Sequence, residues 1–473
     1  MTSTVRACAG PVAVVVLLGG LEIALPGKGL IVCTAAVLLV PLTLAPRVAV
    51  TLLALFLCLQ DLLVHNLATA DRTLGSMLKA VDEIAMLAGA LYVAVRSLNG
   101  ERFWFRLRDW RWALVFLAAG VISSALHGEG NLPPALLGFA LSCKFFCFIL
   151  FGSAIPWQRG DGDRFLTGVL VATLVIFLVG VWGFTEPNFV VRHVIDPDLV
   201  DQNKRGGVMP AMVPFVHPAA FGWAMAVGVL AATTRLFQKR QRGLAVVVLG
   251  AGLAGVLLSM RRRPLLGILV AVFMTLLQLE RGRRGRALVV TLIVIGGAVG
   301  FGSRFLSATL DDTLSAYGGA EMAEKSARFL LVGVAVELAG LYLPFGCGFG
   351  RFGTYPSTIY YSSVYSQMGI SKVWGFSEDR PMYVMDSYWP HILGEAGIIG
   401  ILAMALFFRS LWSQLRQHQS PVHRFACLIL IEGLVESLAG PVFDQPLQIF
   451  MIGIPIGMAL RFGRQSEAGM GAA

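Results

Sequence analysis

Apolar runs of roughly 20 residues follow one another along almost the whole chain, separated by short polar segments. An α-helix of about 20 apolar residues crosses the roughly 30 Å hydrocarbon core of a bilayer. The pattern therefore predicts an all-α, polytopic membrane helix bundle of about 12–14 transmembrane helices, in a single integral membrane domain over residues 1–473. The expected spans lie near 9–26, 29–45, 47–68, 76–95, 111–127, 133–155, 164–184, 214–236, 243–260, 264–279, 287–302, 385–408, 424–440 and 446–460.

Composition agrees with a chain that lies mostly in lipid. Of its 473 residues, 56% are hydrophobic and only 14% are charged, whereas soluble domains carry about 25% charged residues. The seven cysteines form no disulfide framework and no metal-binding motif. A net charge of +10 would suggest nucleic acid in a soluble protein, but here the excess of Lys and Arg in cytoplasmic loops explains it, so no nucleic-acid partner is expected.

Loop charges give the expected orientation. Three basic loops fall on one side of the predicted bundle: Arg96, Arg102, Arg106, Arg108 and Arg111; Arg235, Lys239, Arg240 and Arg242; and Arg281, Arg283, Arg284 and Arg286. By the positive-inside rule this side is the cytoplasm, and both termini join it. The long segments 185–213 and 303–384 then lie on the outer side. The second is the large outer loop between the last spans, and its helical spacing of apolar residues predicts a helix near 320–341.

Basic residues on the outer side break the charge rule and need another cause. The triplet Arg261, Arg262 and Arg263 stands in a very tight turn between two spans, and Arg205 and Arg328 stand in two other outer segments. An Arg at the centre of a membrane helix costs about 2.5–3.5 kcal/mol, so three at the membrane boundary call for an anionic partner. The guanidinium group suits phosphate oxygens, which predicts a phosphate or diphosphate site. The alternative is that these side chains reach lipid headgroups.

Charged residues also occur inside predicted spans. They are Lys79, Asp82, Glu83, Lys144, Glu432 and Glu436. Mutual pairing inside the bundle is the simpler interpretation, and an ion or proton path is the other.

Four segments, in order over roughly residues 200–405, carry a resemblance to a known family. They are Arg205 to Gly222 with His217-Pro218, Ser259 to Gly267 with the arginine triplet, Arg328 with the glycine-rich Leu343–Phe352, and Asp386 to Gly400. Together they resemble the O-antigen ligases and the O-antigen and exopolysaccharide polymerases. Ligases of this superfamily carry His-Asn where this chain has Asp386-Ser387, and that departure favours a polymerase.

The resemblance implies a GT-C-like, metal-independent inverting glycosyltransferase without a cofactor, multi-pass in the bacterial inner membrane. Its donor would be a glycan on undecaprenyl diphosphate and its acceptor a second glycan, joined on the periplasmic side into a surface polysaccharide or exopolysaccharide. Besides the lipid bilayer, other polysaccharide export proteins would be partners. Arg205, Arg328 and one of Arg261 or Arg262 match the arginines that bind the diphosphate; counting back from Gly267 favours Arg262.

An attacking sugar hydroxyl must lose a proton, so a base near the acceptor helps. Asp386 is the first candidate, and its alternative role is to cap the helix that follows. His391 is the second, against a packing role in that helix. His217 shapes a helix start or binds substrate, and Arg351 is a further substrate-binding candidate beside the glycine-rich loop.

Aromatic residues of the outer loop have two interpretations as well. Tyr355, Tyr360, Tyr361, Tyr365 and Trp374 either stack on sugar rings or anchor the loop at the membrane interface. Two functions rival polymerisation. One is a ligase that transfers the finished polymer to another acceptor, and the other is a transporter or flippase of lipid-linked sugars that uses the charges inside the spans.

Overall fold

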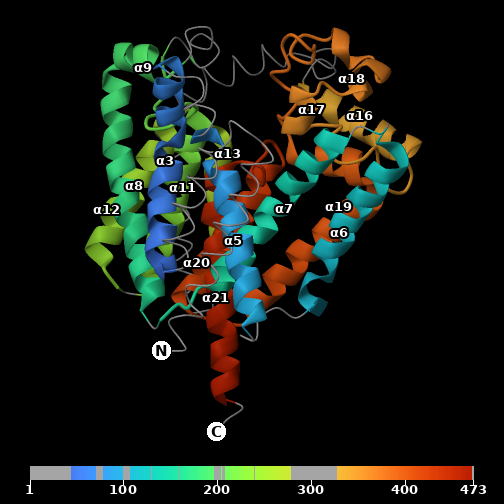
Figure 1. Ribbon diagram of the computed structural model, residues 1–473. Helices are drawn as coiled ribbons and strands as arrows, with labels where there is room; N and C mark the ends of the chain where they lie inside the picture. The colour runs from blue at the N-terminus through green and yellow to red at the C-terminus, as the bar shows by residue number, and fades with distance from the viewer. Residues whose placement is uncertain are drawn as a thin grey trace.

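The computed structural model describes residues 44–70, 78–99, 107–128, 130, 132–158, 160–195, 204, 208–238, 240–278 and 327–470. Regular structure in these ranges is helical (Figure 1). The helices are α3 (Pro46–Ala70), α5 (Val81–Leu98), α6 (Leu107–His127), α7 (Leu132–Ala154), α8 (Asp161–Thr185), α9 (Pro187–His193), α11 (Pro218–Phe237), α12 (Arg242–Leu258), α13 (Arg262–Gln278), α16 (Ala327–Leu341), α17 (Tyr355–Ile359), α18 (Ser363–Gln367), the 3₁₀ helix η2 (Ile370–Lys372), α19 (Tyr388–Arg416), α20 (Pro421–Ser437) and α21 (Pro446–Met470).

Seven of the helices in the described residues are long and apolar enough to cross a membrane. They contain Pro46–Leu67, Trp110–His127, Leu132–Ala154, Asp161–Thr185, Pro218–Phe237, Tyr388–Arg416 and Pro446–Gln465. The chain is therefore a multi-pass membrane protein with an all-α bundle, as predicted. Helices α5, α12, α13 and α20 coincide with four further predicted spans. The predicted spans near 9–26 and 287–302, and nearly all of 29–45, lie outside the described residues.

The bundle has two distinct ends in Figure 1. Helices α16, α17 and α18 form a separate layer at the upper end, and α19 descends from this layer through the bundle. The first turn of α8 and the last turns of α21 lie at the lower end. The upper end is therefore the side on which the sequence predicts the large outer loop.

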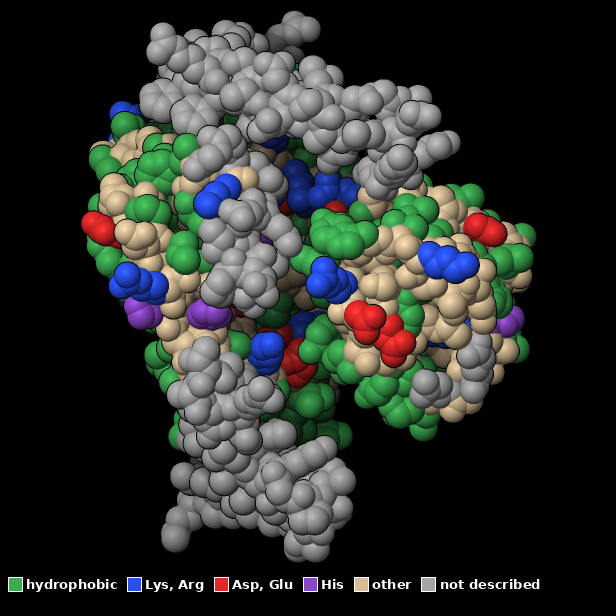
Figure 2. All heavy atoms as spheres, turned by 90° about the horizontal axis from the view of Figure 1, so that it is seen from above, with side chains coloured by type: hydrophobic (Ala, Val, Ile, Leu, Met, Phe, Trp, Pro, Cys, Tyr) green, Lys and Arg blue, Asp and Glu red, His purple; other side chains and the backbone are tan. Residues whose placement is uncertain are grey.

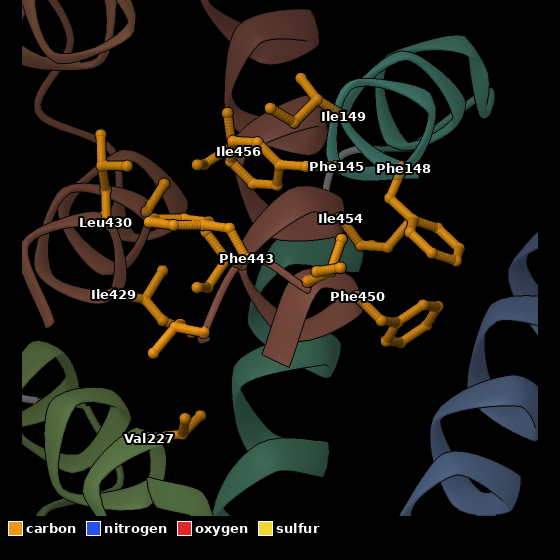
Figure 3. Packing of buried hydrophobic residues seen from close by; sticks show 14 of the residues in the cluster. Phe145, Phe148, Ile149, Val227, Ile429, Leu430, Phe443, Phe450, Ile454 and Ile456 are labelled. Carbon is orange, nitrogen blue, oxygen red and sulfur yellow. The ribbon is translucent and has the colours of Figure 1, made fainter. Parts of the chain in front are cut away.

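Close helix contacts at glycines hold the centre of the bundle together. A Cβ atom added at Gly457 of α21 would lie 2.3 Å from the Ile149 carbonyl oxygen of α7, and one at Gly152 would lie 2.8 Å from the Ile454 carbonyl oxygen. Such approach of backbones is the usual basis of helix packing in lipid, because hydrophobic side chains gain little by leaving hydrocarbon. Around this contact, Figure 3 shows side chains of α7, α20 and α21 interlocking, including Phe145, Leu430 and Phe450.

The charged residues inside the predicted spans are in part paired. The buried Lys144 ammonium lies 2.6 Å from an Asp82 carboxylate oxygen and 2.8 Å from one of Glu83, so α7 and α5 are joined by an ion triad. Glu432 is fully buried, and its carboxylate faces α13 at Gly267, where a Cβ would lie 1.7 Å from it. Only a glycine at position 267 leaves room for this carboxyl group.

The large outer loop contains helix α16, which falls within the predicted stretch 320–341. Leu331, Val334 and Leu338 of α16 are buried against a small hydrophobic cluster that includes Phe352 and Tyr365. The opposite face of α16 exposes Phe329, Val332 and Val336. Helix α16 packs against α19. Arg328, near the beginning of α16, therefore lies close to Asp386, which precedes α19.

Candidate functional site

The arginine triplet lies in a turn that the Ser259 side chain shapes. The Ser259 hydroxyl donates to the Val256 carbonyl at 2.6 Å and accepts from the Arg261 amide at 3.3 Å. Met260 between them adopts a left-handed conformation with φ 51°, which is uncommon for a residue with a side chain. The chain thus reverses between α12 and α13 within three residues and presents all three arginines at the end of the bundle that carries α16–α18.

Two of these arginines act electrostatically on the carboxylate that pairs with Arg328. The Arg328 Nε atom lies 2.8 Å from an Asp386 carboxylate oxygen, and both side chains are about one-third exposed. Burial raises the pKa of Asp386, while the positive charges of Arg328, Arg263 and Arg261 hold it down. We call Arg261, Arg263, Arg328 and Asp386 the arginine cluster. The positive charges of three guanidinium groups act on one carboxylate there, and Arg263 also acts on the buried carboxyl group of Glu436.

The view from the α16–α18 end shows the same concentration of charge. In Figure 2, Lys and Arg side chains gather in the middle of this face, between the layer formed by α16–α18 and the rest of the bundle. A concentration of positive charge of this kind attracts an anion.

Arg263 holds a central place in the cluster. It donates a hydrogen bond to the Ala439 carbonyl just after α20, and its guanidinium group lies next to Gly440. Arg262, which residue counting favours, is the first residue of α13 and has an exposed side chain. The sequence does not reveal which of the two side chains is exposed. That depends on the left-handed conformation of Met260, which sets the direction in which each arginine leaves the turn.

The segment that contains His217 and the segment that contains the arginine triplet lie against each other. His217 caps α11, where its Nδ1 atom accepts from the Ala219 amide at 3.2 Å. One turn further along, a Cβ added at Gly222 would lie 2.6 Å from the Ser259 hydroxyl. The segment that His217 opens thus packs directly on the arginine turn. Arg205 lies outside the described residues, so the predicted convergence of arginines is seen for two of the three segments.

The glycine-rich loop Leu343–Phe352 and the segment that begins at Asp386 also pack together, through Glu395 of α19. Its carboxylate accepts hydrogen bonds from the Arg351 amide at 2.9 Å, the Phe352 amide at 3.0 Å and the Thr354 hydroxyl at 2.9 Å. Gly348 donates to the Glu395 carbonyl at 3.0 Å. This buried acid fixes the glycine-rich loop to the helix that follows Asp386.

The Arg351 side chain also stabilises the glycine-rich loop. It is buried, and its guanidinium group donates to the His127 carbonyl, to the Cys347 carbonyl at 3.3 Å and to the Ser363 hydroxyl at 3.3 Å. These contacts tie the loop to α6 and to α18. They give Arg351 a structural role, whereas its predicted role in substrate binding has no geometric support beyond its place in the loop.

Asp386 and His391 occupy different surroundings. The N-cap of α19 is Ser387, so Asp386 is not the cap that the sequence offered as its alternative role. His391 is buried, its Nδ1 atom is 3.5 Å from an Asp444 carboxylate oxygen, and its ring stands edge-on to Tyr388. Asp386 is therefore the more accessible of the two candidate bases.

The aromatic residues of the outer loop divide into two groups. Tyr355, Tyr360 and Trp374 are exposed, which fits both stacking on a sugar and anchoring at the interface. Tyr365 is completely buried, with its hydroxyl 2.7 Å from that of Ser357, and Tyr361 donates to the Phe376 carbonyl at 2.6 Å. These last two hold the outer loop together.

Comparison with known proteins adds no assignment. No model of a protein family matches the chain, and no curated protein matches it either.

Proposed function

We propose that this chain is a membrane glycosyltransferase that polymerises lipid-linked oligosaccharide repeat units, carried on undecaprenyl diphosphate, at the periplasmic face. The observation that carries the proposal is the arginine cluster, in which Arg261, Arg263 and Arg328 act on the single carboxylate of Asp386. A diphosphate matches this charge, and arginine is the side chain best suited to grip phosphate oxygens. The ligase and the flippase remain the competing functions.

The reaction needs little from the protein besides charge and position. The bond between the sugar C1 atom and the diphosphate oxygen breaks, and its electron pair leaves with the diphosphate. The acceptor hydroxyl oxygen forms the new bond to C1 from the opposite face, which inverts the configuration, and its proton passes to a base. Positive charges fixed in advance stabilise the negative charge that develops on the leaving group. We assign this work to Arg261, Arg263 and Arg328, with Arg205 and Arg262 as further ligands of the diphosphate.

Asp386 is assigned the role of the base. Because it pairs with Arg328, an incoming diphosphate competes with it for the guanidinium group and frees the carboxylate for the acceptor. His391 is too deeply buried to reach a sugar in this arrangement. The structure thus favours Asp386 over His391 for the chemical step.

A strain that lacks the protein tests the function. A polymerase predicts that single repeat units accumulate on the lipid carrier and are exposed on the periplasmic side. Finished polymer left on the lipid would instead indicate a ligase, and repeat units trapped on the cytoplasmic side would indicate a flippase. Either of these two results would contradict the proposal.

The role of Asp386 predicts a specific pH dependence. Because burial raises its pKa above the ordinary value, we expect polymerisation to fall, as the pH is lowered, at a pH above the range of about 4 that is usual for an aspartate. Replacing Asp386 by Asn removes this acidic limb and slows turnover about 10²–10⁴-fold. The measurement is the rate against pH with purified enzyme, and unchanged turnover of the variant would remove Asp386 as the base.

A further inference from the structure

A long groove lies on the side of the bundle, away from the arginine cluster. Helices α3 and α8 form its walls, with α11 and α21 behind them, and it encloses a cavity of about 420 Å³. These helices run alongside one another in Figure 1. The floor is formed by buried apolar residues, among them Trp223 and Val227 of α11.

The apolar walls of the groove are partly exposed. Val48 and Leu55 on its α3 wall are 55% and 54% exposed. On the α8 wall, a Cβ added at Gly168 would meet nothing within 4 Å. An apolar trough of this kind, open to lipid, has the shape and polarity for an acyl chain.

One end of the groove is polar and basic. Arg47 Nε and Arg164 Nη1 lie 3.3 and 3.4 Å from the two carboxylate oxygens of Asp161, and the Arg164 side chain is 82% exposed. All three residues line the groove. Two guanidinium groups share one carboxylate there, which leaves one positive charge at the membrane boundary.

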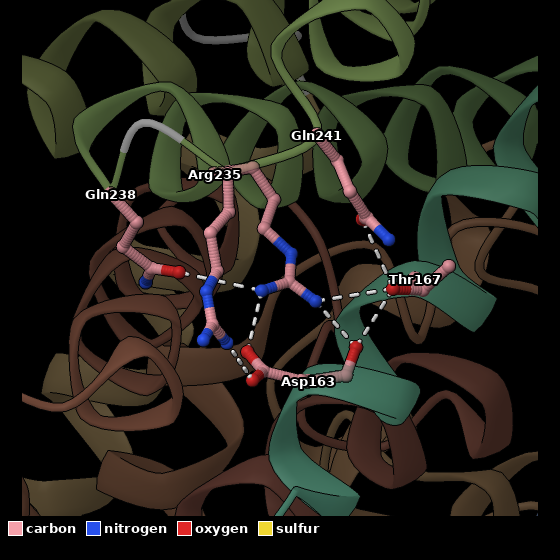
Figure 4. A network of polar contacts seen from close by, with 6 residues as sticks. Asp163, Thr167, Arg235, Gln238 and Gln241 are labelled. Carbon is pink, nitrogen blue, oxygen red and sulfur yellow. Dashed lines mark hydrogen bonds and ion pairs between the residues drawn. The ribbon is translucent and has the colours of Figure 1, made fainter.

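A second basic hollow adjoins this end. Arg235 donates to Asp163 at 2.6 Å and to Thr167 at 3.1 Å, and Arg240 pairs with the other Asp163 oxygen (Figure 4). Arg164 lines this hollow as well as the groove. Among the described residues, the groove and the hollow are together lined by four arginines and two aspartates, so basic side chains outnumber acidic ones by two at this end of the groove.

We propose that this groove binds an anionic glycerophospholipid, with its phosphate on Arg164 and one acyl chain between α3 and α8. The charge at the end selects an anionic headgroup, since each basic residue near an anionic membrane surface contributes about 1 kcal/mol. The side of the groove that opens to the bilayer lets the chain enter without unfolding any helix. The proposal does not depend on the glycosyltransferase assignment, because the groove lies on other helices.

Native mass spectrometry of the full-length, delipidated protein tests it, with phosphatidylglycerol and phosphatidylcholine titrated in parallel. We expect phosphatidylglycerol to bind at least about fivefold more tightly, from a single charge-selective contact. Arg164→Glu abolishes this preference, and Gly168→Leu weakens binding of both lipids by filling the groove. Both positions are open, so neither change disturbs packing, and the melting temperature of each variant verifies this.

Arg416→Ala is the matched control, because Arg416 is an exposed arginine at the end of α19, at the same end of the bundle. It is expected to bind both lipids as the wild type does. Equal binding of the two lipids by the wild type would overturn the headgroup site. Unchanged binding by Gly168→Leu would overturn the groove as the site of the acyl chain.

Discussion

Replacing Arg263 by Ala is expected to lower the rate of polymer formation about 10²–10³-fold, the usual loss when one preorganised group that stabilises a developing anion is removed. Arg263 acts on Asp386 and is held in place by the Ala439 carbonyl, so its guanidinium group is fixed before substrate arrives. The same change at the exposed Arg262 is expected to cost less than about tenfold. The measurement is polymer length and rate with purified protein of verified abundance.

The comparison of adjacent arginines makes this prediction specific. Arg263→Ala and Arg262→Ala each remove one positive charge from the same turn. A difference in rate between the two variants therefore cannot come from the loss of charge alone. A larger loss for Arg262→Ala would show that the diphosphate sits on the outer side of the turn, against the assignment made from the structure. Arg263→Lys should recover part of the activity, because it restores the charge but not the paired N–H geometry.

Glu395→Ala is expected to have the second large effect, this time on stability. Glu395 is buried, and its carboxylate is the acceptor for two loop amides and one hydroxyl. Its removal leaves those buried donors without their acceptor, which costs about 3–5 kcal/mol of unfolding free energy. We expect a lower melting temperature and faster proteolysis in the outer loop between Tyr342 and Asp386, with activity lost because Arg328 and Asp386 both flank this loop.

The control for Glu395 is Glu337→Ala. Glu337 lies on α16, in the same outer layer, but its side chain is exposed, so its removal should leave the melting temperature unchanged. A Glu395→Ala variant that melts and resists protease as the wild type does would show that the loop is held by other contacts.

Hydropathy predicted the helices well for a physical reason. A helix in lipid must satisfy all its backbone hydrogen bonds internally. A nearly continuous apolar run such as Leu132–Ala154 is therefore expected to form a single membrane-spanning helix, as it does in the structure. Pairs of short helices such as α12 and α13 were predicted because the arginine turn between them interrupts the apolar run. The same reasoning said nothing about which helices touch, since glycines such as Gly152 and Gly457 act only through their partners in space.

The anion site stays a prediction, and the structure bears only on where its residues lie. An anion site was expected from arginines on the unfavoured side, and the structure does bring Arg261 and Arg328 to one place. Arg263 was missed as an individual residue, because its role follows from a left-handed turn and from the end of α20. Asp444 and Glu395 were missed because their partners, His391 and the loop amides, are recognisable only once the chain has folded.

Binding of the lipid diphosphate itself tests the central claim most directly. Purified protein in nanodiscs would be titrated with undecaprenyl diphosphate, comparing the wild type with the double variant Arg263→Ala, Arg328→Ala and with the control Arg416→Ala. Saturable binding by the wild type and by Arg416→Ala, with a loss of at least about 100-fold in the double variant, is the expected result. Equal affinity in all three proteins would show that the arginine cluster does not hold a diphosphate.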